Sequence, residues 1–321
     1  MKDMRTVITG QLPASPPPPS GEFGEVRIPA PPTPLSRERL LEEVRGATAI
    51  VSTLNDRIDA EVADAAGSGL RVVANVAVGY DNIDVSALQD RGVIVTTTPG
   101  VLTDATADLT MGLLLSVTRR LGEGERLLRS RAPWTFELGF MLGTGLQGKT
   151  LGIVGLGQIG RAVAHRARAF GMNIVYTSRR RAPEQVEETC DAVHLSFEEL
   201  LRTADVVSLH CPLIPQTRHL IDAQSLANMK PTAYLVNTTR GPVVDEAALA
   251  EALSAGQIAG AGLDVFEHEP EVEPRLLGCD NLVLSPHLGS ATKETRNAMT
   301  QLAFDNVRAV LRGDDPLTAL P

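Results

Sequence analysis

The 321-residue chain is predicted to fold as an α/β protein with two doubly wound parallel sheets. Three observations lead to this prediction. Short strands rich in β-branched residues alternate with short helical stretches, one long helical stretch divides the chain, and the alternation restarts around a glycine-rich loop. Strands that are joined through helices run parallel, so each half of the chain predicts a parallel sheet of its own.

The composition is that of a globular protein with sizeable cores, since 43% of the residues are hydrophobic, 21% are charged and the net charge is −9. An acidic chain is not drawn to nucleic acid or to an anionic membrane, and no apolar run reaches membrane-spanning length. The start, MKDMRTVITG, has the pattern of a first strand rather than of a signal peptide. Cys190, Cys211 and Cys279 form no disulfide framework and suit a reducing compartment. We therefore expect a cytoplasmic protein without nucleic-acid or membrane partners.

The first part of the chain is expected to contain four strands. Residues 6–9 form the first strand, and the stretch that follows, residues 12–34, is too rich in proline to hold a helix. A helix capped by Ser36 is expected to end at Gly46. The other three strands are expected within residues 47–53, 70–78 and 93–99, with a helix near residues 59–69.

From residue 103 to residue 121 the sequence predicts one long helix, followed by a loop that carries Trp134. The basic residues near its end are expected to form a solvated face rather than a binding patch; they are Arg119, Arg120, Arg126, Arg129 and Arg131. Strands are then expected within residues 150–154, 173–180, 205–212, 232–241, 260–266 and 281–286. One helix is expected from the glycine loop to Phe170, and a second begins at a capping box of Ser196 and Glu199. A third ends near Gly256, and a fourth covers residues 292–311.

The glycine-rich loop comprises Gly155, Leu156, Gly157, Gln158, Ile159 and Gly160, directly after a strand and at the start of a helix. The same pattern without this context would be weak evidence, because glycines also mark plain turns. In a strand–loop–helix unit the glycines permit the tight turn and let backbone N–H groups approach a pyrophosphate. The loop therefore predicts a dinucleotide site.

A carboxylate is normally expected at the end of the next strand, where it binds the ribose hydroxyls of NAD. This chain has Ser178 there, followed by Arg179 and Arg180. An acid would repel a 2′-phosphate, whereas serine does not, and guanidinium groups bind phosphate oxygens well. Exposed arginines are also common in loops without a ligand, and that alternative stays open. The stretch predicts NADP(H) as cofactor.

Three further segments follow the carboxyl ends of expected strands, where open α/β sheets collect ligands. They supply Arg240, Glu269 and His287. Reduction of a 2-oxo acid needs a cation for the carboxylate and carbonyl, and a proton for the developing alkoxide. Arg240 is permanently charged, while a carboxylate at Glu269 would favour the protonated imidazole of His287 and fix its tautomer. Each residue alone is more often structural, but the three together predict a reductase site.

Five segments together resemble the D-2-hydroxyacid dehydrogenase family: GLGQIG, HCPLIPQTRHLI, LVNTTRGPVVDEAAL, GAGLDVFEHEP and SPHLGSAT. The resemblance runs from about Ile50 to the end of the sequence, and it implies that Arg240, Glu269 and His287 are the catalytic set. It also implies two Rossmann-like domains. The dinucleotide-binding domain, residues 101–287, would be inserted into a substrate domain made of residues 1–100 and 288–321. The proline-rich stretch departs from the family, which usually has a helix there.

The resemblance assigns binding residues as well. The segment NVAVGYDNID is similar to the family's substrate loop, in which the N–H groups of Val78 and Gly79 meet the substrate carboxylate. Leu54 would lie over a small pocket, and Arg240 and His287 would also contact the substrate. Besides the glycine loop and residues 178–180, the positions similar to the family's cofactor-lining positions are Thr106, His210, Cys211, Pro212, Thr217, Thr238, Thr239, Asp264 and Gly289. No metal is expected, because His210 and Cys211 lack a second ligand pair at metal spacing.

Within the family, Ser178 with two arginines is similar to the NADP-dependent glyoxylate and hydroxypyruvate reductases, which implies reduction of a small 2-oxo acid. Phosphoglycerate dehydrogenases would have an acid at position 178, and formate dehydrogenases pair the histidine with an amide. A dehydrogenase for another 2-hydroxy acid, such as 3-phosphoglycerate, is one alternative. Another is a dinucleotide-sensing binding protein, because corepressors of the same fold retain the triad. The sequence does not rank glyoxylate, hydroxypyruvate and larger 2-oxo acids.

A homodimer is predicted from the helix over residues 103–121, which is apolar on several sides, while one sheet covers only one side. The resemblance implies pairing through this region, with the adjoining loop crossing to the partner. Trp134 would then lie near the partner's substrate pocket. Burial of the helix within its own monomer and a plain core or interface role for Trp134 are the alternatives.

Overall fold

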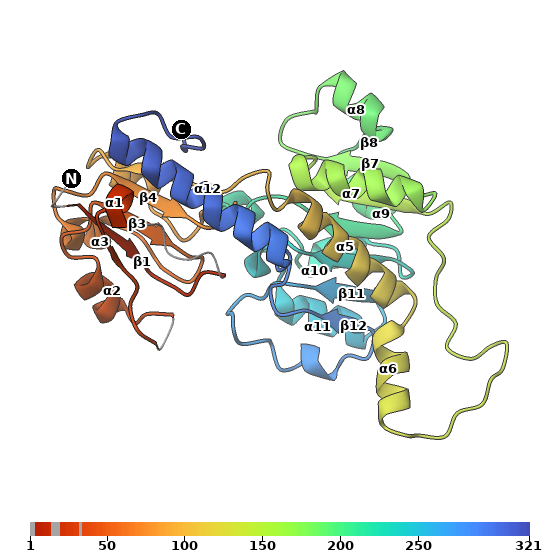
Figure 1. The fold of residues 1–321 in the computed structure, drawn as a ribbon. Coiled ribbons are helices and arrows are strands. Elements are labelled where there is room, and N and C mark those ends of the chain that lie inside the picture. Colours follow the sequence, from red (N-terminus) through yellow and green to blue (C-terminus); the bar gives the residue numbers. More distant parts are fainter. Residues whose placement is uncertain (1–3, 14–19, 32–33) are drawn as a thin grey trace. The chain divides into compact units, whose positions relative to one another are not determined.

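The computed structural model describes residues 4–13, 20–31 and 34–321, and it divides into two compact units. The first unit consists of Met1–Leu102 with Ser290–Pro321, and the second of Thr103–Gly289 (Figure 1). These divisions lie beside the limits expected from the sequence, at residues 100 and 287. Each unit is built on a parallel sheet with helices on both faces, so the predicted fold class is confirmed.

The first unit contains a five-stranded parallel sheet in the order β2-β1-β3-β4-β5. Its strands are β1 (Arg5–Ile8), β2 (Glu25–Arg27), β3 (Ala49–Ser52), β4 (Val72–Asn75) and β5 (Ile94–Thr96). Its helices are α1 (Ser20–Phe23), α2 (Arg37–Glu43), α3 (Ala60–Ala66), α4 (Val85–Gln89) and α12 (Lys293–Arg312). Ser36 caps α2 as predicted, because its side chain accepts the Arg39 N–H.

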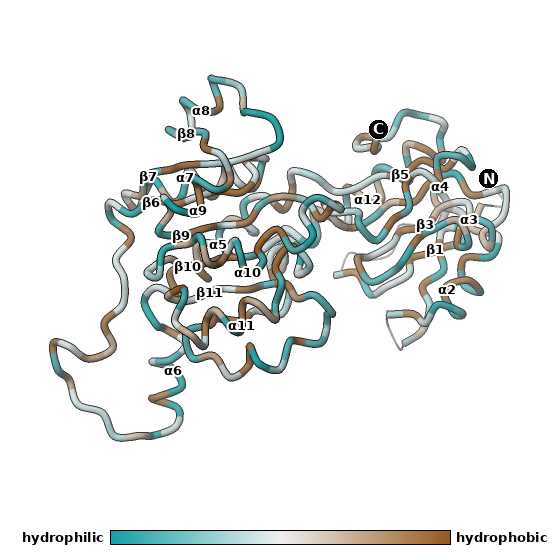
Figure 2. Tube along the Cα trace, turned by 180° about the vertical axis from the view of Figure 1, so that it is seen from behind, coloured by the Kyte–Doolittle hydropathy of each residue, from teal (hydrophilic) through white to brown (hydrophobic). Residues whose placement is uncertain are grey.

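Alternate residues of the central strands pack on opposite faces of this sheet. Ile50 of β3 packs with α2, α3 and α4, whereas its neighbour Val51 packs with α12. Helix α12 presents Phe304 and Val307 to that second face, and both side chains are buried. The strands therefore have two buried faces, which explains their continuous apolar sequences and their hydrophobic colouring in Figure 2.

The prediction that residues 12–34 hold no helix is wrong, and it also missed a strand. Helix α1 forms one turn, and β2 pairs in parallel with β1 as the edge strand. Phe23 is fully buried and its ring meets that of Phe304 edge to face, with the centroids 5.8 Å apart. Phe23 thus packs the turn of α1 onto α12, and it lies in a part of the stretch, residues 20–28, that contains no proline. Residues 14–19 and 32–33, which hold most of the prolines of the stretch, lie outside the described residues.

The second unit contains a seven-stranded parallel sheet in the order β12-β11-β10-β9-β6-β7-β8. Its strands are β6 (Thr150–Val154), β7 (Asn173–Thr177), β8 (Ala192–His194), β9 (Val206–Leu209), β10 (Tyr234–Asn237), β11 (Gly260–Leu263) and β12 (Leu282–Leu284). Because β6 comes first in the chain and lies between β9 and β7, the winding direction reverses there. Open α/β sheets bind ligands at this switch point, beyond the carboxyl ends of the strands.

Helices cover both faces of the second sheet. One face carries α5 (Thr103–Thr118) and α7 (Gln158–Ala169), which lie side by side (Figure 1). The other face carries α9 (Phe197–Thr203), α10 (Ala223–Asn228) and α11 (Glu246–Ser254). Helix α8 (Glu184–Cys190) precedes β8, and short 3-10 turns lie at Pro215–Thr217, Gly241–Val243 and Leu276–Gly278. The capping box at Ser196 and Glu199 is present at the start of α9, as predicted.

The long helix expected over residues 103–121 is present, but it ends earlier than predicted, at Thr118, because the chain breaks at Arg120. Arg120 has a left-handed φ of 55°, and a separate helix, α6 (Leu121–Arg129), begins after it. The Arg120 guanidinium pairs with Glu123 in the first turn of α6, at 2.6 Å, which stabilises the new helix start. We call α6 and the loop over residues 130–149 the arm; the loop extends away from the sheet of this unit in Figures 1 and 2.

Helix α5 is largely buried within its own chain, which removes the argument for a dimer that rested on its apolar faces. Met111, Leu113, Leu114 and Val117 are buried among residues of the sheet and of α7, and Leu109 and Leu115 pack against the same core. Within the described residues, no helix combines the length and the hydropathy needed to cross a membrane.

Candidate active site

The predicted catalytic residues all lie at the carboxyl edge of the second sheet. Arg240 follows β10, Glu269 follows β11 and His287 follows β12, and these three strands are neighbours in the sheet. Parallel strands end at the same edge, which brings three segments that are far apart in sequence to one place.

Glu269 and His287 form a direct pair, with 2.7 Å between the carboxylate Oε2 and the imidazole Nδ1. Burial acts to raise the pKa of Glu269, but the hydrogen bond and charge of His287, the Phe266 N–H and the charge of Arg240 outweigh it and lower that pKa. The carboxylate is thus ionised near neutral pH, and an ionised carboxylate only accepts hydrogen bonds. Nδ1 of His287 therefore carries a hydrogen, and Nε2 is the nitrogen that can exchange a proton with a substrate.

His287 has a left-handed backbone, with φ of 54°, which is uncommon for a residue other than glycine. Asp264 holds this conformation through three contacts. Its carbonyl oxygen accepts the His287 N–H at 2.8 Å, and its carboxylate accepts the N–H groups of Leu288 and Gly289 at 2.7 and 2.8 Å. Asp264 is fully buried, and burial raises its pKa. Its side chain fixes the loop that carries His287.

Arg240 lies on a turn that is held at several points. The amide of Asn237 donates to the Arg240 carbonyl at 3.0 Å and accepts from the Thr239 N–H at 3.0 Å. The Arg240 guanidinium donates to the carbonyl of Thr239 at 2.8 Å. The next residue, Gly241, lies directly on the Phe266–Glu267 peptide, because an added Cβ would come within 1.8 Å of the Phe266 carbonyl carbon. Only glycine fits this close approach between the turn after β10 and the segment after β11.

The glycine loop has the form that a dinucleotide requires. Gly155 has a φ of +100°, and an added Cβ would come within 2.7 Å of the His210 carbonyl oxygen. Gly160 lies as closely on Gly155, with 2.2 Å from an added Cβ to the Gly155 carbonyl oxygen. Gly157 faces open space and begins α7 without a side-chain cap. The first N–H groups of this helix are thus open to an anion.

The residues at the end of β7 differ in their availability to a ligand. Arg181 pairs with Glu187 at 2.8 Å, and this bond, with the Tyr176 hydroxyl, lowers the pKa of Glu187 to about 2. Arg179 and Arg180 are exposed, and in the described part of the chain their guanidinium groups have no hydrogen bond or ion pair. The Ser178 hydroxyl donates to the Arg180 carbonyl at 2.6 Å, which closes the turn. The two arginines are therefore the cations that a phosphate could meet here.

His210 and Cys211 lie against the glycine loop at the end of β9. Burial lowers the pKa of His210 to about 3 and raises that of Cys211 to about 11, so both side chains are neutral near pH 7. The His210 ring bonds Ser208 through Nε2 at 2.8 Å, while its buried Nδ1 has no partner among the described residues. The described part of the chain contains no group of three or more histidine, cysteine, aspartate or glutamate side chains that could hold a metal ion.

The other predicted cofactor residues divide into two groups. Thr238 bonds Thr110 through their hydroxyls at 2.9 Å, and an added Cβ on Gly289 would lie 3.6 Å from the Thr106 hydroxyl, so these residues are close to the catalytic turns. Thr217 instead uses its hydroxyl locally, since it donates to the Pro212 carbonyl and accepts the Ile214 N–H.

In the first unit, the predicted substrate residues lie on two loops at the carboxyl edge of that sheet. Leu54 is half-buried on the turn after β3, and Val78 is exposed on the loop after β4. Two asparagines that the sequence analysis did not select hold these loops. Asn82 donates to the carbonyl of Thr53 at 3.1 Å, and Asn75 donates to the carbonyl of Gly79 at 3.1 Å. The sequence signal for Asn75 was an amide at the end of an apolar strand; Asn82, in the loop after it, had no such signal.

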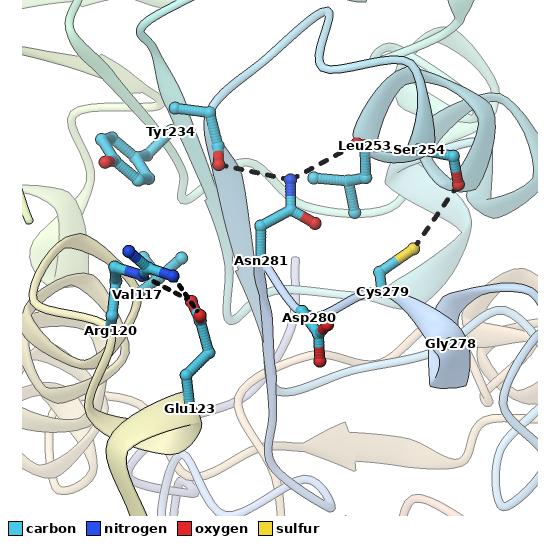
Figure 3. Close-up of a pocket in the computed structure, with 11 residues that line it drawn as sticks. Val117, Arg120, Glu123, Tyr234, Leu253, Ser254, Gly278, Cys279, Asp280 and Asn281 are labelled. Carbon is cyan, nitrogen blue, oxygen red and sulfur yellow. Dashed lines mark hydrogen bonds and ion pairs between the residues drawn. The ribbon is translucent and has the colours of Figure 1, made fainter. Parts of the chain in front are cut away.

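A pocket of about 440 Å³ lies at the opposite edge of the second sheet (Figure 3). It is lined by residues around the amino ends of β10, β11 and β12, including Tyr234 and Asn281, and by Arg120 and Glu123, which pair with each other. Because the predicted catalytic residues lie at the carboxyl ends of the same strands, this pocket is separate from the candidate active site.

Comparisons with known proteins identify the family to which the chain belongs. A model of the NAD-binding domain of D-isomer specific 2-hydroxyacid dehydrogenases matches residues 111–289. A glyoxylate reductase of Thermococcus litoralis is 47% identical over 316 residues, which cover 97% of this chain and 95% of that protein. The chain belongs to the D-isomer specific 2-hydroxyacid dehydrogenase family, and its second unit contains the region that matches the family's NAD-binding domain.

Two solved structures show the same fold over nearly their whole lengths. A protein of Thermus thermophilus is 44% identical, with a TM-score of 0.90, covering 99% of this chain and 100% of that one. An NADPH-dependent glyoxylate/hydroxypyruvate reductase of Sinorhizobium meliloti, solved with NADP and malonate, is 35% identical, with a TM-score of 0.85, covering 99% of this chain and 97% of that one.

Proposed function

We propose that the protein is an NADPH-dependent reductase that converts a small 2-oxo acid, glyoxylate or hydroxypyruvate, to the D-2-hydroxy acid. The observation that carries this proposal is the Glu269–His287 pair, 2.7 Å apart and close enough to Arg240 for its charge to lower the pKa of Glu269. A relative and a solved structure with reductase names support the substrate class. In a reducing cytoplasm, the free thiols Cys190, Cys211 and Cys279 would stay reduced.

The proposed chemistry assigns one task to each residue. Arg240 binds the substrate carboxylate and polarises the carbonyl, since a guanidinium keeps its charge at any working pH. When bound, the nicotinamide dinucleotide supplies the hydride to the carbonyl carbon. His287 gives the proton from Nε2 to the carbonyl oxygen, and Glu269 stabilises the imidazolium before the transfer and holds Nδ1. One hydride and one proton together reduce the carbonyl to the alcohol.

We assign cofactor binding to the second unit, and to the first unit we assign substrate contacts in addition to those of Arg240 and His287. The open helix start at Gly157 and the close approaches at Gly155 and Gly160 suit a pyrophosphate. Arg179 and Arg180 suit a 2′-phosphate, which is the basis for choosing NADPH over NADH. Leu54 and the N–H groups of Val78 and Gly79 are proposed to bind the substrate.

Substrate turnover tests this proposal and separates it from a dinucleotide-sensing binding protein. The purified protein is mixed with NADPH and with glyoxylate, hydroxypyruvate or larger 2-oxo acids, and loss of absorbance at the NADPH band is followed. We expect turnover with the small acids and a higher kcat/KM for NADPH than for NADH. Tight binding of NADPH without turnover of any 2-oxo acid would favour the binding protein.

We also propose a homodimer, now supported by the arm rather than by α5. Phe136, Leu138 and Leu142 are 76%, 90% and 68% exposed, which is costly for apolar side chains that face water. A second copy of the chain is the partner that a symmetric enzyme offers to such a surface. Light scattering at micromolar concentration should give twice the monomer mass, and Leu138→Asp should lower it; a stable, active monomer would contradict the proposal.

A further inference from the structure

His219 lies outside the predicted site, yet hydrogen bonds connect it to the backbone that carries two catalytic residues. Its Nε2 is 2.9 Å from Oε2 of Glu267. The other oxygen of Glu267 accepts the N–H of Glu246 at 3.1 Å. In return, the Glu246 carboxylate accepts the N–H of Glu267 at 2.7 Å. Glu267 is therefore bonded at its backbone and at both carboxylate oxygens.

The Phe266–Glu267 peptide is the point where the segments of Arg240 and Glu269 meet. Gly241, directly after Arg240, lies against this peptide so closely that no Cβ would fit. The N–H of Phe266, which belongs to the preceding Val265–Phe266 peptide, donates to Oε1 of Glu269 at 3.0 Å. A shift of this peptide would therefore move Glu269, the partner of His287, relative to Arg240.

The backbone of His219 is fixed as firmly as its side chain. It has a left-handed φ of 49°, and its N–H donates to the carbonyl of Pro242 at 2.8 Å. The following residues run parallel to the segment after Arg240, since Ile221 forms a bridge with Val244. Such strain in a residue other than glycine persists only where the surrounding structure holds it.

Glu246 and Glu267 place two carboxylates side by side, which is unfavourable without a counter-charge or donor. Glu246 is buried, and burial, followed by the charge of Glu267, raises its pKa. The His219 imidazole is the donor that stabilises Glu267 from the opposite side, and its side chain is 38% exposed. The His219 imidazole bonds the segment after β11 at Glu267, Glu267 bonds α11 at Glu246, and the His219 backbone N–H bonds the turn after β10 at Pro242.

We propose that His219 is a positioning residue for the reaction, which holds the Phe266–Glu267 peptide and thereby sets the placement of Glu269 against Arg240 and His287. The inference rests on the proposed function, because it takes the roles of those three residues from it. His219 does not act on the substrate. It acts through Glu267.

Two substitutions at position 219 separate positioning from simple structural support. His219→Asn tolerates a left-handed backbone but is too short to reach Glu267, whereas His219→Gln keeps an N–H donor at the length of Nε2. We expect the asparagine variant to lose up to about a hundredfold in kcat, the cost of misplacing a catalytic group by ~1 Å, with KM for NADPH unchanged. Its rate should also begin to fall at lower pH, and the glutamine variant should retain most of the activity.

A matched control is available in the same unit. Lys230 pairs with Asp205 at 3.0 Å, and its side chain is 37% exposed, close to the 38% of His219. Lys230→Gln removes an ion pair of similar exposure whose residues lie away from the catalytic edge. It should change neither kcat nor the pH profile. An asparagine variant at position 219 that loses thermal stability but keeps both kinetic properties would overturn the proposal.

A second readout needs no substrate. The hydrogen on Nδ1 of His287, bonded to Glu269 at 2.7 Å, should give a downfield proton NMR signal that His287→Gln removes. We expect this signal to shift or broaden in the asparagine variant and to stay in the Lys230 control; an unchanged signal in the former would overturn the proposal. If the unmodified protein reduces no 2-oxo acid, the proposed function fails while this measurement still decides the role of His219. Should the asparagine variant not fold, Glu267→Gln replaces it with the same criteria, because the amide oxygen can still accept the Glu246 N–H.

Discussion

The catalytic edge of the second sheet and the arm of the same unit differ in how their side chains are held. At the edge, Glu269, Asp264 and Asn237 each make hydrogen bonds at distances near 3 Å or shorter with backbone or side-chain partners in the same unit. In the arm, Leu138 is 90% exposed, and Trp134 stacks on Phe140 of the same loop, at 5.9 Å between centroids. The hydrogen bonds at the edge are made within the second unit, whereas the arm has apolar side chains that the described residues of that unit leave exposed.

This difference decides what each kind of mutation should do. A change at the edge should alter the chemistry directly, because the partners of these side chains lie in the same unit. A change in the arm should act through the binding partner that covers the exposed apolar side chains of the arm.

Loss of the His287 imidazole should have the largest effect. His287→Ala removes the proposed proton donor, and general acid catalysis typically contributes about 10²–10⁴-fold, so kcat should fall by that order. NADPH binding, measured by fluorescence titration, should be unchanged because the glycine loop is intact. A kcat within a few-fold of the unmodified enzyme would show that another group supplies the proton.

Glu269→Gln should lower kcat less and should move the pH profile. The pKa of Glu269 is lowered, so its carboxylate stays ionised through neutral and mildly acidic pH and supports the imidazolium there. The amide has no charge, and the protonated imidazole that donates the proton is then lost at lower pH. The high-pH limb of kcat against pH should therefore move toward lower pH. An unmoved limb would show that Glu269 is not coupled to the donor.

Cofactor preference should respond to Arg179 and Arg180, which the described structure leaves without ion pairs. Replacing both by alanine should raise KM for NADPH by about tenfold or more, since charge-assisted hydrogen bonds contribute about 1.5–3 kcal/mol each, while KM for NADH changes little. Arg202→Ala is the control, because Arg202 is an exposed arginine paired with Glu198 on α9. Equal catalytic efficiency with both cofactors in the unmodified protein would contradict the assignment.

The sequence predicted those features that depend on local patterns. Alternating strands and helices gave both sheets, Ser36 and Ser196 marked helix starts through their side-chain oxygens, and polar residues after three strands gave Arg240, Glu269 and His287. Each signal lies within a few residues of the feature it predicts, so no knowledge of distant contacts was needed.

The features that were missed depend on contacts between distant residues. The turn of α1 exists because Phe23 meets Phe304, and the break at Arg120 lies within a stretch whose composition favours continuous helix. The left-handed backbones of His219 and His287 leave no mark in the sequence, because histidine is not a residue that requires such a φ. The role of Glu267 likewise depends on Glu246, which lies in another segment.

The smallest expected effect belongs to Trp134, and it bears most directly on the comparison with the catalytic edge. Trp134 is 53% exposed, which rules out a core role within this chain. If the arm of one subunit reaches the substrate pocket of its partner, Trp134→Ala should change the ratio of kcat/KM for hydroxypyruvate to that for glyoxylate by about tenfold, the lower end of the range for one apolar contact. Leu138→Ala, a change at another exposed apolar residue of the arm, is the matched control and should leave that ratio alone. Substrate ratios that are equal in the two variants would limit Trp134 to a structural role, and the catalytic edge would then determine selectivity without the arm.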